Sequence, residues 1–244
     1  MKRGRYVVAV GFIRGNLRKT QTPEAEMTKE YRQHVYRPPV GAVDLLLIRH
    51  GESEPARQGE SFQMKDGHGD PALHANGQAQ AQAVGARLKD DPLAALYVTT
   101  LRRTHQTAAP LAAHQNLTPV VEADLREVCL GDWDGGLYRI KAAEGHPAFT
   151  RAEAGQEWGE IPGAETTAQL HARVRAGLLR IAARHADQRV AAVVHGGVIG
   201  AAMSIATGAA PFAFNGAGNG SISRLVIIGD RMVVRGFNDT THLG

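Results

Sequence analysis

VDLLLIRHGE, at residues 43–52, is the stretch that decides the fold of this 244-residue chain. Val43 to Ile48 is a short apolar run that stops abruptly at polar residues, which is typical of a fully buried parallel strand. Val190 to Val194 repeats this pattern and stops at His195. The two runs therefore predict two buried strands of one sheet.

Helical periodicity separates these runs. The clearest apolar face recurs at Leu170, Val174, Leu178 and Ile181, and Thr166 or Thr167 can cap this helix. Further helices are expected over 77–89, 104–116 and 198–207, and further strands over 93–98, 222–228 and 232–236, the last two flanking a Gly229-Asp230 turn. This alternation predicts an α/β fold, a mostly parallel sheet with helices on both faces and a C-terminal antiparallel hairpin.

Composition excludes several classes of protein. Hydrophobic residues make up 43% and charged residues 21%, which is ordinary for a globular chain and unlike a disordered, collagenous or coiled-coil one. No apolar run approaches the roughly 18 residues of a membrane span, so we expect a soluble protein with no membrane partner. A single cysteine, Cys129, excludes an intrachain disulfide and fits a cytoplasmic location.

Positive charge is concentrated at the N-terminus. Residues 1–40 hold nine Lys or Arg against three acids, although the whole chain carries only +4. We interpret residues 1–42 as a basic extension without chemistry of its own, ended by Pro38-Pro39. One alternative is that this arm helps a homodimer to form. Another is that it binds nucleic acid or lipid. Residues 43–244 are then the folded domain, in which an irregular segment at about 130–161 is expected to form a cap.

Two of the predicted strands end in histidine. Ligands of open α/β sheets bind beyond the carboxyl ends of the strands, so His50 and His195 are expected at one site. Arg49 adds a guanidinium there, Arg102 and Arg103 follow the next strand, and Gly196 leaves backbone N–H groups open at a helix start. Such a set suits a tetrahedral dianion, and bidentate arginine contacts match phosphate oxygens. We expect a phosphoryl ligand.

Four motifs resemble the histidine phosphatase superfamily, the phosphoglycerate mutase-like proteins, over about residues 43–236. They are LIRHGES at 47–53, LRRTHQT at 101–107, LRE with GDWDG at 125–127 and 131–135, and VVHGGV at 193–198. The resemblance implies a three-layer phosphoglycerate mutase-like fold. It also implies that His50 becomes phosphorylated, that Arg103 rather than Arg102 binds phosphate, that Glu127 is the proton donor and that His195 is the second histidine.

The chain also departs from this family. Pro55-Ala56 stands where the family has Trp-Asn, so an amide that would touch the phosphate is missing, and we expect Gln63 or another loop residue to replace it. Ser53, Gln63 and Gly196 complete the expected phosphate-binding set. Mutases carry a basic stretch after the acid, whereas Val128-Cys129-Leu130 is apolar and uncharged. That difference favours water as the phosphoryl acceptor.

The expected function is a metal-independent phosphomonoester hydrolase that acts through a phosphohistidine on a small phosphorylated metabolite. A neutral imidazole at His50 can attack phosphorus, and arginines with a cationic His195 can stabilise the transferring group, so neither metal nor cofactor is required. Phosphotransfer of the phosphoglycerate mutase type and a non-catalytic phospho-ligand-binding protein are the alternatives. Sugar phosphates, nucleotide fragments and phosphorylated acids remain equally open as substrates.

Overall fold

The computed structural model describes residues 30–244, of which 37–244 form one compact unit. Residues 30–36 have neither helix nor strand. Residues 1–29, most of the basic extension expected at residues 1–42, lie outside the described residues. The expected contribution of this arm to a homodimer therefore stays a prediction.

A six-stranded sheet in the order β5-β4-β6-β1-β7-β8 organises the unit. Its strands are β1 (Val43–Arg49), β4 (Ala95–Val98), β5 (Val120–Val121), β6 (Arg189–Val194), β7 (Ile222–Ile228) and β8 (Arg231–Asp239). β5, β4, β6 and β1 pair in parallel, whereas β7 and β8 are antiparallel. The predicted mostly parallel sheet with a C-terminal antiparallel hairpin is confirmed.

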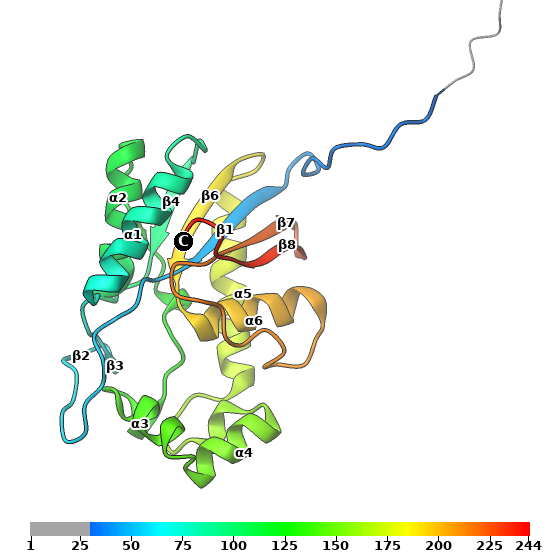
Figure 1. Cartoon of the computed structure of the whole chain (residues 1–244). Coiled ribbons are helices and arrows are strands. Elements are labelled where there is room, and N and C mark those ends of the chain that lie inside the picture. Colours follow the sequence, from blue (N-terminus) through cyan, green and yellow to red (C-terminus); the bar gives the residue numbers. More distant parts are fainter. Residues whose placement is uncertain (1–29) are drawn as a thin grey trace, which may run out of the picture. The chain divides into compact units, whose positions relative to one another are not determined.

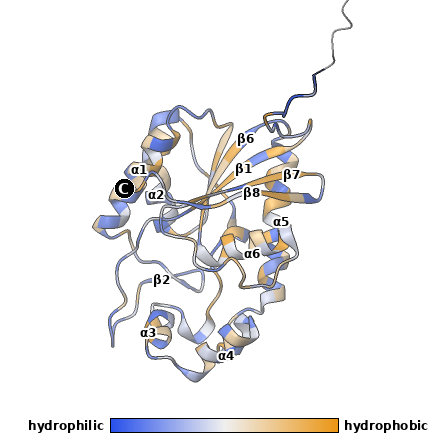
Figure 2. Ribbon diagram, turned by 45° about the vertical axis from the view of Figure 1, so that its right-hand side comes forward, coloured by the Kyte–Doolittle hydropathy of each residue, from blue (hydrophilic) through white to orange (hydrophobic). Residues whose placement is uncertain are grey.

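Helices cover both faces of this sheet (Figure 1). α1 (Ala75–Leu88) and α2 (Arg102–Gln115) share one apolar cluster with Leu46 and Ile48 of β1, and α5 (Thr167–Arg184) and α6 (Gly196–Thr207) share the other with Leu45 and Leu47. Successive strand residues point to opposite faces, so an apolar run like β1 supplies both clusters. The hydropathy colouring of Figure 2 shows this apolar centre between helices with polar outer faces.

Local sequence explains where the main elements begin and end. Thr166 caps α5 as predicted, because its side chain accepts from the backbone N–H of Gln169 while the Gln169 side chain accepts from the backbone N–H of Thr166. Asn116 ends α2 in the left-handed conformation, with a φ of 52°. Gly229 adopts a φ of 57° in the tight turn between β7 and β8.

The cap is helical, and the prediction of an irregular segment at 130–161 was wrong. It contains α3 (Leu137–Ala143), α4 (Pro147–Gly155) and the 3₁₀ turns η2 (Gly131–Trp133) and η3 (Trp158–Glu160). The residues that suggested irregularity mark element boundaries, since Gly136 precedes α3 with a φ of 107° and Pro147 is the first residue of α4. Ala148, Ala152 and Trp158 join the cap to the larger apolar cluster.

Three short strands and one turn were also missed. β2 (Met64–Lys65) and β3 (His68–Gly69) form a small hairpin in the segment expected to be a loop, and the two-residue strand β5 leads into the 3₁₀ turn η1 (Ala123–Leu125). Elements of two residues carry no detectable periodicity. Within residues 30–244, no helix combines the length and the apolar character that crossing a membrane requires.

Candidate active site

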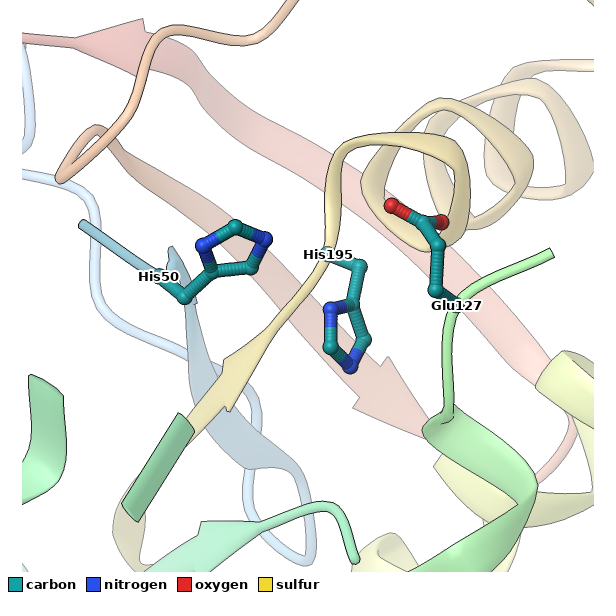
Figure 3. Close-up of side chains that lie close together, drawn as sticks. All are labelled: His50, Glu127 and His195. Atoms are coloured by element: carbon teal, nitrogen blue, oxygen red, sulfur yellow. The ribbon is translucent and has the colours of Figure 1, made fainter. Parts of the chain in front are cut away.

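His50 and His195 leave the sheet side by side. They follow the last residues of β1 and β6, which are adjacent parallel strands, and the backbone N–H of His50 donates to the carbonyl of Val194 at 2.9 Å. The two imidazole centroids are 5.1 Å apart with an interplanar angle of 63°. Figure 3 shows both rings and the Glu127 carboxylate converging from three separate segments.

Hydrogen bonds define the state of the His50 ring. Its Nδ1 lies 2.7 Å from the carbonyl oxygen of Gly51, and a carbonyl can only accept, so Nδ1 carries the proton. The lone pair is therefore on Nε2, which accepts from the Nε–H of Arg103 at 3.3 Å. Burial, followed by the charges of Arg103 and Arg49, lowers the pKa of His50 well below its usual 6.5. His50 is consequently neutral near pH 7 in the unliganded site.

Two guanidinium groups flank this ring. Arg103, in the first turn of α2, is buried and also donates to the carbonyl of Gly69 at 2.9 Å. Arg49 donates to the carbonyl of Ala217, while its buried Nε has no hydrogen-bond partner in the part of the chain that the structure describes. Arg102 points elsewhere and pairs with Asp70 at 3.2 Å. Arg103, not Arg102, is thus the arginine brought to His50.

Glu127 approaches from the loop between η1 and η2. Its Oε1 accepts from the backbone N–H of Val128 at 3.0 Å and of Gly197 at 3.2 Å. A Cβ at Gly197 would lie 2.8 Å from that oxygen and 2.5 Å from Val128 Cγ2, so this close approach requires glycine. The ligand atoms of His50, Glu127 and His195 all lie within 4.8 Å of one another.

His195 is fully buried. Its Nε2 lies 3.0 Å from Thr99 Oγ1, and its Nδ1 has no hydrogen-bond partner among residues 30–244. Burial, then the charges of Arg103 and His50, lower its pKa well below 6.5. The expectation that His195 is a cation therefore does not hold for the unliganded site, although a bound dianion would favour its protonated form.

A cavity of about 350 Å³ opens at His50, and the buried His195 is not among the residues that line it. Of the residues expected from the sequence, its walls include Arg49, His50, Arg103, Glu127 and Gly196. Ser53 lines instead an adjoining cavity of about 600 Å³ that shares Arg49 and His50 with the first.

Gln63 does not replace the missing amide as expected. Its Oε1 accepts from Arg102 Nη2 at 2.5 Å, and it lines a third cavity together with Arg102 and Asp70. Gln63 thus bonds to Arg102, which is itself paired with Asp70, and its amide is held away from His50.

Arg139 is a cationic site residue that the sequence analysis placed in the expected cap but not among the phosphate-binding residues. It extends from α3 into both cavities, donates to Ser53 Oγ at 2.8 Å and to the Glu54 carbonyl at 2.9 Å, and lies 5.5 Å from the centre of the Phe62 ring. Burial, then the charge of Arg49, lower its pKa. Asn215, from the loop after α6, also lines the first cavity. No local sequence pattern marks either residue.

The cap supplies the outer wall of the first cavity. Trp133 and Trp158 are buried in the apolar core, as expected for packing residues, but both also line the cavity. Tyr138 stands between them, and burial raises the pKa of its hydroxyl to about 12. Glu153 of α4 completes this side. A ligand held at His50 would therefore present its remainder to an aromatic wall that also carries Asp134 and Glu153.

His50, Glu127 and His195 are also donors that transition metals accept. The guanidinium groups of Arg49, Arg103 and Arg139 surround the same space, however, and the Arg103 Nε–H occupies the lone pair of His50. Opposite charges attract, so this arrangement favours an anion over a cation.

A protein-family model described as "Histidine phosphatase superfamily (branch 1)" matches residues 45–240. The chain belongs to the histidine phosphatase superfamily. This assignment confirms the resemblance drawn from the four motifs and agrees with the phosphoglycerate mutase-like arrangement of the sheet.

Relatives in this superfamily include named phosphatases. The chain is 31% identical over 205 residues to phosphoserine phosphatase 1 of Hydrogenobacter thermophilus, covering 83% of this chain and 95% of that one. It is 32% identical over 163 residues to phosphoglycerate mutase-like protein 4 of Arabidopsis thaliana, covering 66% and 69%. The structure of a mycobacterial glucosyl-3-phosphoglycerate phosphatase aligns with a TM-score of 0.67 and 26% identity over 82% of this chain and all of that one. These relatives support a small-molecule phosphatase within the superfamily.

Proposed function

We propose that this protein is a metal-independent phosphomonoester hydrolase that acts through a phosphohistidine at His50. The observation that carries the proposal is the orientation of that imidazole. With Nδ1–H bound to the Gly51 carbonyl, the lone pair lies on Nε2, which accepts from Arg103 in the unliganded site and is released for attack when Arg103 donates to a phosphoryl oxygen instead. An imidazole held in this tautomer is a nucleophile that needs no separate base.

The cations around His50 support phosphate binding. Arg49, with its unpartnered Nε, and Arg103 can contact the oxygens of a phosphoryl group and stabilise its charge during transfer. Gly196 supports the same role, because a Cβ there would lie 3.3 Å from Arg49 Nε and would crowd the anion. His195 can donate from its free Nδ1 once the bound dianion favours protonation.

Glu127 is suited to moving the proton in both steps. In the first step the Nε2–P bond forms, the bond to the leaving oxygen breaks, and protonated Glu127 gives its proton to that oxygen. In the second step Glu127 takes a proton from water while the water oxygen bonds to phosphorus and the Nε2–P bond breaks. Orthophosphate leaves, and His50 and Glu127 return to their starting states.

The cavity supports a small substrate. Its volume of about 350 Å³ lies at the low end of ordinary ligand pockets. Relatives named as acting on phosphoserine or glucosyl-3-phosphoglycerate make phosphorylated acids the first compounds to test.

A panel of phosphorylated metabolites and p-nitrophenyl phosphate, assayed for phosphate release with and without excess EDTA, tests the proposal. We expect turnover that EDTA leaves unchanged, that vanadate inhibits, and that His50→Ala abolishes. Acid-labile ³²P retained by the wild-type protein after a rapid quench would report the phosphohistidine. Turnover that survives in His50→Ala would exclude the proposed nucleophile, and loss of turnover in EDTA would exclude metal independence.

The same panel separates the two alternatives. Phosphotransfer would move label between positions of a phosphorylated acid without releasing orthophosphate. A binding protein would show saturable binding of phosphorylated ligands and no turnover of any of them.

A further inference from the structure

We propose that Arg173 of α5 is a positioning residue for Glu127, an inference that rests on the proposed role of Glu127 as proton donor. Residues 126–130 join η1 to η2 and belong to no helix or strand. 3₁₀ hydrogen bonds hold the backbone only at the two ends of this segment, from the Arg126 N–H to the Ala123 carbonyl and from the Trp133 N–H to the Leu130 carbonyl, so Glu127 between them needs other support. α5 supplies that support.

The Arg173 guanidinium binds the backbone on the approach to Glu127. Its Nη1 donates to the carbonyls of Asp124 at 2.8 Å and Arg126 at 2.7 Å, and its Nη2 donates to the carbonyl of Glu127 at 2.9 Å. One side chain therefore satisfies three carbonyls of a four-residue stretch that ends at the proton donor. His68 contacts the Glu127 carbonyl as well, through Nε2 at 3.1 Å.

Glu165 completes the clamp from the other side. Arg173 donates to Glu165 Oε2 through Nε at 2.9 Å and to Oε1 through Nη2 at 2.5 Å. Glu165 in turn accepts from the N–H of Cys129 at 2.8 Å, and its own N–H donates to the Cys129 carbonyl at 3.0 Å. The backbone is thus tied down both before and after Glu127, by a pair of side chains that are mostly buried.

This clamp requires arginine. A guanidinium has five N–H donors in a rigid fork, and the five hydrogen bonds of Arg173 use all of them. Lysine offers three donors around one nitrogen and cannot reach three carbonyls and both carboxylate oxygens. The capping box and buried apolar face of α5 give the fork a fixed base. Arg173 of α5 therefore fixes the backbone from which the Glu127 carboxylate reaches the site.

A positioning role predicts selective loss of proton donation. An alkoxide leaves slowly without a proton, whereas p-nitrophenolate is stable enough to leave without one. Displacing Glu127 by about 1 Å can cost on the order of 100-fold in rate, and only in steps where its proton is needed. A merely structural Arg173 would affect both kinds of substrate equally when it is removed.

The experiment compares kcat/KM for p-nitrophenyl phosphate and for the best alkyl phosphate of the panel in three variants of the full chain. Glu127→Gln is the reference for loss of the proton donor. Arg180→Met is the matched control, because Arg180 also lies on α5 and pairs with Glu122 and Asp124 but contacts no residue of 126–129. We expect Glu127→Gln and Arg173→Met each to lower kcat/KM for the alkyl phosphate at least tenfold more than for p-nitrophenyl phosphate, because kcat/KM reports the step in which the leaving oxygen departs and not the hydrolysis of the phosphohistidine that both substrates share. Arg180→Met leaves the buried Glu122 without this partner but breaks no hydrogen bond to residues 126–129, so the ratio of the two rates should stay within about threefold of wild type.

Each other result is decisive. Selective loss in Glu127→Gln with equal loss in Arg173→Met would overturn the positioning role and leave the proposed function intact. Equal loss in Glu127→Gln would instead show that the proposed proton donor is wrong. If Arg173→Met does not fold, Arg173→Lys and Glu165→Gln keep part of the clamp and must show the same selectivity, and equal losses in both would overturn the proposal.

Discussion

The His50 imidazole donates from Nδ1 to the Gly51 carbonyl, and its buried Nε2 lies beside Arg103. Its lowered pKa means that protonation of the nucleophile requires a lower pH than it does for a free histidine. Histidine NMR of the unliganded protein should therefore show His50 still neutral at pH 6.5.

The lowered pKa of His50 should also affect the pH dependence of kcat/KM. The acid limb of kcat/KM reports groups of the free enzyme, so the midpoint that His50 gives it should lie well below 6.5. A His50 resonance that titrates at 6.5, together with an acid limb at that pH, would contradict the neutral-nucleophile mechanism.

Gly197 offers a second test at the scale of one residue. Its substitution by alanine would put a Cβ 2.5 Å from Val128 Cγ2 and 2.8 Å from Glu127 Oε1, so the carboxylate must shift. We expect kcat for an alkyl phosphate to fall by about 100-fold, the effect of misplacing a catalytic group by an ångström. Gly155→Ala is the control, because nothing lies within 4 Å of its added Cβ. Equal rates in the two variants would show that Glu127 tolerates displacement.

At the scale of elements, the N-terminus of α5 carries a stability prediction. Thr166→Ala removes the side-chain acceptor for the Gln169 N–H, and loss of such a cap costs about 1 kcal/mol. Chemical denaturation should show this decrease in the free energy of unfolding, with Thr166→Ser close to wild type. A Thr166→Ala protein as stable as wild type would indicate that the packing of α5 makes the cap redundant.

Helices and strands could be predicted from the sequence where their buried residues form an apolar run or repeat with a regular period. β1 and β6 are uninterrupted apolar runs, and the face of α5 repeats every turn, so their existence and type follow from periodicity. α3 is too short to show a period and holds its place through tertiary contacts. Because Arg139 enters the site from that helix, its role could not be predicted, and neither could that of Asn215.

The catalytic residues within the four motifs could be predicted from the family resemblance rather than from periodicity. His50, Glu127 and His195 come from three distant segments, and only the family resemblance joined Glu127 to the histidines. The structure brings them together, whereas Gln63, assigned without a motif, lines another cavity. Sequence spacing alone cannot reveal which way a loop side chain points.

The molecule as a whole should lose stability in acid. His50 and His195 are buried, and their pKa values lie well below 6.5 in the folded state, whereas unfolded histidines titrate near 6.5. The unfolded chain therefore binds more protons as the pH falls below 6.5, and folding becomes less favourable by at most about 1.4 kcal/mol per pH unit for each ring.

Urea denaturation of the unliganded protein at pH 7.5 and 5.5 measures this effect. We expect a lower midpoint at pH 5.5, and a smaller difference in His195→Asn, which removes one of the two rings. An identical pH dependence in the two proteins would show that His195 does not contribute.

The pairing of β1 with β6 also has a consequence for the precision of the site. The ladder aligns Arg49 with Val194, so His50 and His195 are the next residues in step although 145 positions separate them in the chain. Side chains alternate along a strand, so a slip of a single residue would turn the two imidazoles toward opposite sides of the sheet. The backbone hydrogen bonds between β1 and β6 thus set the spacing of the two rings. The cap, which would contact the part of a ligand beyond its phosphoryl group, does not affect this spacing.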